Sequence, residues 1–181
     1  NSWEGVYFDI NQQGMDQMMA DIASMGGELF VMDDGWFGDK YPRKNDSSSL
    51  GDWVVDKNKL PNGIEGLLSD AKKHGVKFGI WIEPEMANTT SELYEKHPDW
   101  VLKASERDVV LGRGGTQVVL DLANPAVQDF VFGVVDNLMT SYPEIDYIKW
   151  DANMSVQNHG SQYLTKDNQS HMYIEFHREI G

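Results

Sequence analysis

Polar side chains that could do chemistry follow a largely apolar segment, residues 145–148, late in the chain. Lys149, Asp151 and Asn153 come at every second position after it. Because successive side chains of a strand point to opposite faces, these three would share one face if the strand continues through them. An ammonium, a carboxylate and an amide on one face suit a binding or catalytic site. A strand that runs out into solvent would also carry polar residues, so this segment alone leaves both interpretations open.

Acidic and amide residues also end the other segments that are typical of strands. These segments are residues 4–11, 28–36 and 76–86, and residues 145–151 form the fourth. The polar residues at their ends are Asp9, Asn11, Asp33, Asp34, Glu83, Glu85, Lys149, Asp151 and Asn153. Such groups at the ends of all four strands favour a shared cleft, because parallel α/β sheets bind ligands at the carboxyl ends of their strands.

Helical segments separate these strands. The apolar spacing predicts helices over residues 14–26, 63–75 and 124–143, with shorter helical segments at 90–98 and 171–180. Residues 37–62 are typical of a long polar loop, and residues 100–122 of extended, hairpin-like structure. Strands that alternate with helices predict a parallel sheet, either doubly wound and open or closed as a (β/α)8 barrel. No G-x-G-x-x-G motif follows the first strand, which disfavours a dinucleotide-binding sheet.

The composition argues against some classes of ligand. The chain has 181 residues, a formal net charge of −14, 40% hydrophobic residues and no cysteine, a balance that fits one folded domain over residues 1–181. The negative charge argues against a nucleic acid or an anionic membrane surface as a partner, because both attract Lys and Arg. No segment is long and apolar enough to span a membrane. A neutral ligand such as a sugar is compatible with the acidic surface.

Aromatic residues accompany the carboxylates, which favours a sugar as the ligand. Indole rings that could stack on a sugar lie in or beside the strand ends, at Trp36, Trp53, Trp81 and Trp150. A metal site is the main alternative. The histidines lie away from the strand ends, at His74, His97, His159, His171 and His177, which leaves only an oxygen-rich Mg or Ca site open. Lys149 counts against a cation there and would instead keep Asp151 ionised, as a nucleophile requires.

Four motifs, in their order along the chain, resemble the catalytic barrel of the α-galactosidases of glycoside hydrolase family 36. They are MDDGWFG at 32–38, LGDW at 50–53, GIWIEPEM at 79–86 and KWDAN at 149–153. The resemblance extends over essentially the whole chain and implies a (β/α)8 barrel of which about the first half, four βα units, is present. It also implies a retaining hydrolase that releases terminal α-linked galactose from oligosaccharides through a covalent galactosyl-enzyme, without a cofactor or a metal.

The resemblance further implies roles for individual residues. Asp151 of the K-W-D motif would be the nucleophile, and Lys149 and Asn153 would hold substrate hydroxyls beside it. Asp33 and Asp34 resemble the carboxylate pair that receives the 4- and 6-hydroxyls of galactose. Both could reach the sugar only if the strand ends or bulges at this point, because adjacent residues of a regular strand face opposite ways.

Two more residues are expected in the sugar site from the same resemblance. Trp81 resembles a ring that lines the sugar subsite, and Arg113 resembles an arginine that the family places near the substrate. Two extra residues separate Arg113 from Gln117 relative to the family pattern. Structural and functional roles stay open for Trp36, Asp52, Trp53, Glu83 and Glu85, while structural roles are favoured for Asp9, Asp121 and Trp150.

One required group has no counterpart in the chain. A retaining glycosidase needs a second carboxyl group, about 5 Å from the nucleophile, to protonate the departing oxygen. In the family this group is an Asp on a later strand, and no motif here matches it, so we expect little or no activity from the chain alone.

Other expectations concern assembly and alternative functions. The outer strands of a half barrel would have unpaired edges, which predicts a homodimer that pairs them. The alternatives on the same residues are a transglycosylase, an α-N-acetylgalactosaminidase, a metal-dependent barrel enzyme, and a non-catalytic sugar-binding or self-assembling half-barrel.

Overall fold

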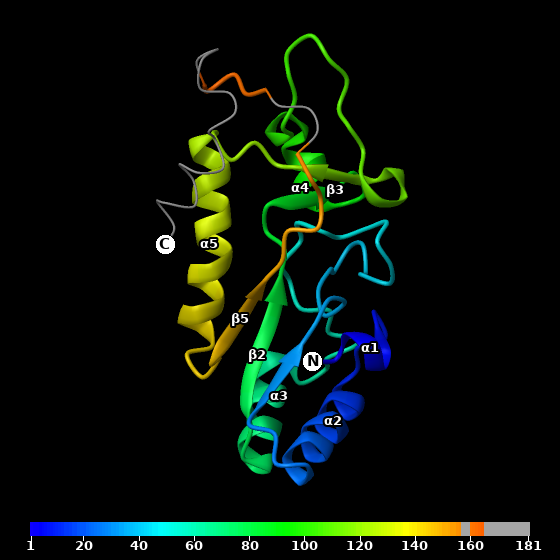
Figure 1. The fold of residues 1–181 in the computed structure, drawn as a ribbon, viewed down its shortest axis with the longest axis vertical. Helices are drawn as coiled ribbons and strands as arrows, with labels where there is room; N and C mark the ends of the chain where they lie inside the picture. The colour runs from blue at the N-terminus through cyan, green and yellow to red at the C-terminus, as the bar shows by residue number, and fades with distance from the viewer. Residues whose placement is uncertain (157–159, 165–181) are drawn as a thin grey trace.

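A parallel sheet of three strands forms the centre of the computed structural model, which describes residues 1–156 and 160–164 (Figure 1). The strands lie in the order β1-β2-β5 and are β1 (Leu29–Met32), β2 (Lys77–Ile82) and β5 (Tyr147–Trp150). All three point in the same direction, toward the end of the molecule that carries β3 (Met86–Asn88) and α4 (Glu92–Lys96). The carboxyl ends of the strands therefore meet at this end.

The main helices form where the sequence predicts them, because their ends carry capping residues. They are α2 (Gln12–Ser24), α3 (Gly63–His74) and α5 (Pro125–Ser141). Asn11 caps α2 by accepting a hydrogen bond from the Gly14 amide, and Asn124 caps α5 in the same way through the Ala126 amide. Helix α3 ends at Gly75, whose φ of 72° is a left-handed conformation that glycine adopts without strain.

The hydrophobic core lies between the sheet and these helices. Strand β2 is buried at every position except its first, as expected for a central parallel strand that is covered on both faces. The side chains that fill this core include Met15, Met19, Phe30, Met32, Ile64, Leu67, Phe78 and Ile80. Burying each of them contributes roughly 1.5–3 kcal/mol to stability. A second cluster, around Val118, Leu120, Val127 and Val131, packs strand β4 (Gln117–Val119) against α5.

The strand predicted at residues 4–11 is wrong. This segment begins in the short helix α1 (Trp3–Val6), which ends at Tyr7 with a φ of 48°. Helical backbone wins here because the Trp3 ring contacts the rings of Tyr7 and Phe8 at centroid distances of 5.2 and 5.1 Å. Ser2 instead lies along the free edge of β1, where its amide donates to the Val31 carbonyl at 3.0 Å. The described residues thus contain three parallel strands rather than four.

The region between β2 and α5 forms a small antiparallel sheet, in which β3 pairs with β4. The hairpin-like structure predicted over residues 100–122 is present in part, because the bridge between Val101 and Leu120 is flanked by hydrogen bonds from Leu102 N to the Val119 carbonyl and from Asp121 N to the Trp100 carbonyl. Residues 98–100 and 113–115 form short 3-10 turns, η1 (Pro98–Trp100) and η2 (Arg113–Gly115). The helix predicted at 171–180 lies outside the described residues.

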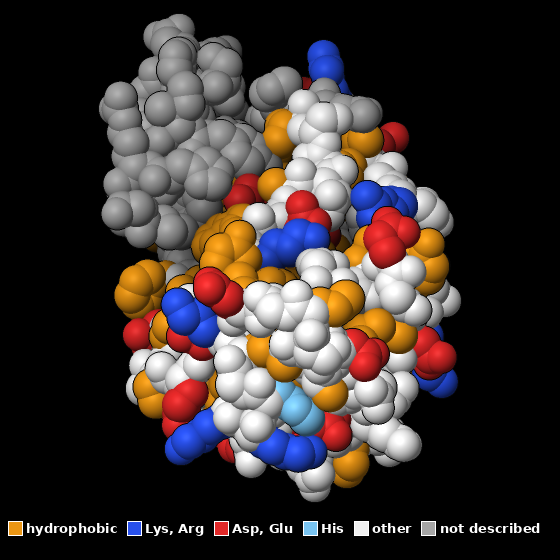
Figure 2. Space-filling model, turned by 60° about the horizontal axis from the view of Figure 1, so that its bottom comes forward, with side chains coloured by type: hydrophobic (Ala, Val, Ile, Leu, Met, Phe, Trp, Pro, Cys, Tyr) orange, Lys and Arg blue, Asp and Glu red, His pale blue; other side chains and the backbone are white. Residues whose placement is uncertain are grey.

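The surface carries charges of both signs. Figure 2 shows acidic and basic side chains interspersed over the face opposite the strand ends, rather than gathered into one patch. Among the described residues, no helix is long and apolar enough to cross a membrane.

Candidate active site

The pairing of the three strands brings the predicted polar residues to one level of the sheet. Trp81 of β2 lies opposite Lys149 of β5, and Met32 of β1 lies opposite Ile80, so Asp33 follows at the level of Trp81. Paired residues of neighbouring parallel strands point to the same face. The Lys149 ammonium donates to Asp33 Oδ2 at 2.7 Å, a contact that spans the width of the sheet. The predicted polar residues that follow β1 and lie on β2 and β5 are therefore neighbours at the strand ends.

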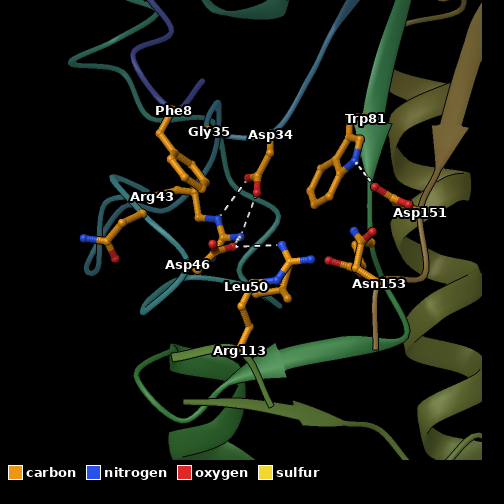
Figure 3. Close-up of polar contacts among 12 residues, drawn as sticks. Phe8, Asp34, Gly35, Arg43, Asp46, Leu50, Trp81, Arg113, Asp151 and Asn153 are labelled. Carbon is orange, nitrogen blue, oxygen red and sulfur yellow. Dashed lines mark hydrogen bonds and ion pairs between the residues drawn. The ribbon is translucent and has the colours of Figure 1, made fainter. Parts of the chain in front are cut away.

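Asp151 lies beside Trp81 and is held by neutral donors (Figure 3). The Trp81 indole N–H donates to Asp151 Oδ2 at 3.0 Å, and the Ala152 amide donates to Oδ1 at 3.1 Å. Burial alone would raise the pKa of Asp151, but these bonds and the Asn153 side chain outweigh it and lower the pKa below its usual value. The carboxylate is half-buried and ionised at neutral pH.

Lys149 contributes less to this ionisation than the sequence suggested. Its charge lowers the pKa of Asp151, yet this contribution is smaller than those of the Trp81 indole, the Asn153 side chain and the Ala152 amide. The reason is geometric, because the ammonium forms its ion pair with Asp33 at 2.7 Å. Lys149 therefore acts in the expected direction, and the Trp81 indole is a further group that favours ionised Asp151.

Asp33 and Asp34 both lie at the site because β1 ends at Met32 and the chain turns at Gly35, whose φ is 112°. Asp33 Oδ2 accepts from Asn1 at 2.6 Å as well as from Lys149. The Asp34 carboxylate is almost fully buried and accepts two hydrogen bonds from a single guanidinium. Burial raises the pKa of Asp34, and that guanidinium partly offsets the effect.

The guanidinium belongs to Arg43, a residue that sequence reasoning missed. Its Nε and Nη2 atoms lie 2.9 and 2.7 Å from the two Asp34 oxygens, and the side chain is 1% exposed. It also lies over the rings of Phe8 and Phe37, at 5.2 and 5.7 Å from their centroids. The sequence offered no signal for it, because the next residue, Lys44, is also basic, stands in the same polar loop and is exposed.

Arg113 lies on the open side of the site. Its guanidinium is 3.3 Å from Asp46 Oδ1, and Figure 3 shows it between Asp46 and Asn153. Gly114 and Gly115, which follow it, lie in a tight turn with φ values of 65° and 70°. Asp46 Oδ1 is also 3.5 Å from Arg43 Nη2, so one carboxylate links a buried arginine to an exposed one.

Glu83 lies next to Asp151 beneath the strand ends. Its Oε1 accepts a hydrogen bond from the Asn153 amide at 2.6 Å, and its side chain is buried. Burial raises the pKa of Glu83 to about 7, and the Asp151 and Asp34 carboxylates add to the rise. Glu85 accepts from the Trp150 indole at 2.8 Å. The two glutamates therefore support the end of β5 and the turn that follows it, and the raised pKa of Glu83 lies near neutral pH.

The other aromatic candidates belong mainly to the core. Trp36 is fully buried and donates from its indole to the Trp81 carbonyl at 2.9 Å, which fixes the backbone beneath the Trp81 ring. Trp53 lies within 6.1 Å of both rings, measured between centroids. Trp150 packs against the two main hydrophobic clusters, on the face opposite Asp151, as its place in the strand predicted.

Two further acidic residues stabilise loops. The sequence left the role of Asp52 open and favoured a structural role for Asp121. Asp52 accepts hydrogen bonds from the amides of Glu92 and Leu93, which anchors the long loop to the start of α4. Asp121 accepts from the Ser161 hydroxyl at 2.7 Å and from the Ala123 amide.

Within residues 1–156 and 160–164, no group of three or more His, Cys, Asp or Glu side chains is arranged to hold a metal ion. Two of the carboxylates at the strand ends have cationic partners, Lys149 for Asp33 and Arg43 for Asp34. His159, Asp167, His171 and His177 lie outside the part of the chain that the structure describes.

Comparison with known proteins identifies the family. The family model described as melibiase matches residues 1–178. The chain belongs to the melibiase family. Relatives of this melibiase chain include alpha-galactosidase AgaA of Geobacillus stearothermophilus, 42% identical over 177 residues that make up 96% of the chain and 24% of that protein. A probable alpha-galactosidase C of Aspergillus flavus is 46% identical over 163 residues, 86% of the chain and 21% of its own length.

Solved structures agree with this assignment. The glycoside hydrolase family 36 alpha-galactosidase AgaB of Geobacillus stearothermophilus superposes with a TM-score of 0.88 at 40% identity. The superposition covers 99% of the melibiase chain and 24% of the AgaB chain. The chain is therefore an α/β segment that corresponds to part of these larger enzymes, and it spans less than a quarter of the curated relatives described above.

Proposed function

We propose that the protein containing this chain is a retaining α-galactosidase that releases terminal α-linked galactose from oligosaccharides. The observation that carries the proposal is the Asp151 carboxylate, half-buried and ionised at the strand ends within the K-W-D motif of a melibiase chain. Related enzymes support the choice of substrate, because variants of AgaA form complexes with raffinose and with stachyose.

In this proposal Asp151 is the nucleophile. Its carboxylate attacks the anomeric carbon, the bond to the leaving oxygen breaks, and water later hydrolyses the galactosyl ester with net retention of configuration. The Trp81 indole holds Asp151 Oδ2 and favours the anionic form. Glu83 is not the proton donor for the departing oxygen in this proposal, because it is buried and bound to the Asn153 amide.

The other predicted residues bind the sugar in this proposal. Asp33 and Asp34 accept hydrogen bonds from the 4- and 6-hydroxyls, and their fixed partners hold the acceptors in place, which selects galactose by its axial 4-hydroxyl. Lys149 and Asn153 bind hydroxyls beside the nucleophile. The Trp81 ring lines the subsite, and Arg113 closes its open side.

The test uses the protein in its full natural length with raffinose as the substrate. We expect release of galactose and sucrose, with α-galactose as the first anomer seen by proton NMR, because two displacements retain the configuration. Initial release of β-galactose, or binding of raffinose without any turnover over hours, would contradict the proposal.

We also propose that the chain forms about the first half of a (β/α)8 barrel. Among the described strands, β1 and β5 are the outer ones, and Tyr147 at the start of β5 is 49% exposed. Residues 1–181 expressed alone would then pair these edges in a homodimer. A monomer by light scattering at micromolar concentration would argue against such pairing.

A further inference from the structure

One lysine connects three separate stretches of backbone at the Asp34 side of the site. The Lys59 ammonium donates to the carbonyls of Phe8, Gly35 and Arg43, at 2.7, 2.6 and 2.7 Å. An ammonium has three N–H groups, so these bonds use all of its donors. The three carbonyls come from stretches of chain 51, 24 and 16 residues away from Lys59.

The carbonyls belong to the residues that build the surroundings of Asp34. Gly35 directly follows Asp34, Arg43 carries the guanidinium that binds both Asp34 oxygens, and the Phe8 ring lies 5.2 Å from that guanidinium. The chain is tightly packed here, because a Cβ atom at Gly35 would come within 2.9 Å of the Phe8 backbone. Lys59 therefore fixes the backbone of every component of the Asp34–Arg43 pair.

Regular secondary structure does little of this work. Between β1 and α3 the only described sheet contact is the isolated bridge of Phe37 with Val55. The position of the Asp34–Arg43 pair thus depends on side-chain contacts such as those of Lys59. Without the ammonium, three inward-facing carbonyls would lose their donor, and the loops would have to move to find another.

We propose that Lys59 is a positioning residue for galactose recognition, which sets the orientation of the Asp34 carboxylate through the backbones of Phe8, Gly35 and Arg43 without contact to the sugar. This inference rests on the proposed α-galactosidase function. It predicts that the loss of Lys59 damages the recognition of one hydroxyl rather than the chemistry at Asp151.

The test compares Lys59→Met with Lys57→Met in the full-length protein. Lys57 is exposed and two residues away, so it is a matched control for loss of a lysine in this loop. The substrates are 4-nitrophenyl α-galactoside and its 4-deoxy and 6-deoxy analogues, with rates expressed per active site titrated by a 2-fluoro galactosyl fluoride. Asp34→Asn is measured on the same substrates. The analogue on which it lowers kcat/KM least identifies the hydroxyl that Asp34 binds.

For Lys59→Met we expect kcat/KM on the parent galactoside to fall about 10- to 100-fold, mainly through KM, since a displacement of about 1 Å in a positioning group costs this much. On the analogue that lacks the Asp34-bound hydroxyl, the loss should be less than about 3-fold. Lys57→Met should match wild type on all three substrates. A purely structural role would lower the titrated fraction of active sites and leave the rates per site unchanged.

A double-mutant cycle completes the test. In an Asp34→Asn background, Lys59→Met should cost less than about 3-fold, because the two substitutions remove the same interaction. Additive losses of kcat/KM in this cycle would overturn the inference. Equal losses of kcat/KM for Lys59→Met on all three substrates would also overturn it. If Lys59→Met yields no active sites, Lys59→Arg replaces it in the test, because a planar guanidinium cannot reproduce three converging bonds. Its loss of kcat/KM on the parent galactoside is then compared with its loss on the analogue that lacks the Asp34-bound hydroxyl. A wild-type protein that cleaves no galactoside would instead contradict the proposed function.

Discussion

The two carboxylates at the ends of β1 and β5 are held in opposite ways. Asp34 is buried, and both its oxygens accept from the cationic Arg43, whereas Asp151 is half-buried and accepts from the neutral Trp81 indole and the Ala152 amide. A carboxylate that is neutralised by a buried cation is a fixed acceptor, suited to binding a hydroxyl. A carboxylate held by neutral donors keeps its negative charge, which a nucleophile needs. The difference supports the proposal that the first binds the sugar and the second carries out the chemistry.

The largest expected effect is that of Asp151→Asn. The amide cannot form the galactosyl ester, so kcat on 4-nitrophenyl α-galactoside in the full-length protein should fall about 10⁴-fold or more. Asp9→Asn, at an exposed acid beyond α1, is the matched control and should keep wild-type kcat. If Asp151→Asn retained more than about a tenth of the wild-type rate, the nucleophile would have to be another carboxylate.

A pair of arginine substitutions sharpens the contrast between buried and exposed partners. Arg43→Met leaves Asp34 buried without its cation and should lower the free energy of unfolding by about 3–5 kcal/mol. It should also abolish galactose binding. Arg113→Met removes an exposed partner of Asp46 and should cost about 1 kcal/mol or less, while still weakening galactose binding. Thermal melting and calorimetric titration with galactose measure both effects. Equal losses of melting temperature would show that burial does not distinguish the two arginines.

Trp81→Phe tests the neutral donor. Loss of the indole N–H removes a bond that lowers the pKa of Asp151, so that pKa should rise. A hydrogen bond to a charged group contributes about 1.5–3 kcal/mol, which corresponds to about one to two pH units. The acid limb of the pH profile of kcat/KM should therefore move to higher pH by this amount. An unchanged acid limb, with only a uniformly lower rate, would mean that the ring contributes by stacking alone.

Glu83→Gln should have the smallest effect on catalysis and act mainly on the pH dependence of stability. Folded Glu83 holds its proton up to about pH 7, whereas the unfolded chain releases it near 4.5. Between these values the folded state binds more protons, so this group lowers stability as the pH rises. Glutamine does not titrate, so it removes this pH dependence of stability while keeping an acceptor for the Asn153 amide. The melting temperature of the variant relative to wild type should increase from pH 4.5 to pH 8, and a constant difference would show that Glu83 titrates normally.

The elements that the sequence predicted correctly are those whose signals are local. Strands β1, β2 and β5 are largely apolar, and α2 and α5 start at the capping residues Asn11 and Asn124. The segment 4–11 failed because its alternating pattern competes with ring contacts that favour a short helix. Local patterns report propensity, and tertiary contacts can override it.

The sequence allowed the candidate site residues to be named, but not the hydrogen-bond and ion-pair partners that hold them. The bond between Trp81 and Asp151 joins residues 70 apart and depends on β2 lying next to β5, with the β3–β4 sheet and α5 between them in the chain. Arg43 and Lys59 lie in an irregular loop, where basic residues that face inward and outward follow each other without a period. Their roles become visible only once the loop is folded against the end of β1.

The most direct measurement of the central claim is covalent trapping of the nucleophile. The full-length protein is incubated with 2-deoxy-2-fluoro-galactosyl fluoride, and its intact mass and peptide map are recorded. The separation of roles between the two carboxylates predicts one galactosyl adduct, on Asp151. An adduct on Asp33, Asp34 or Glu83, or no adduct on a protein that turns over galactosides, would contradict it.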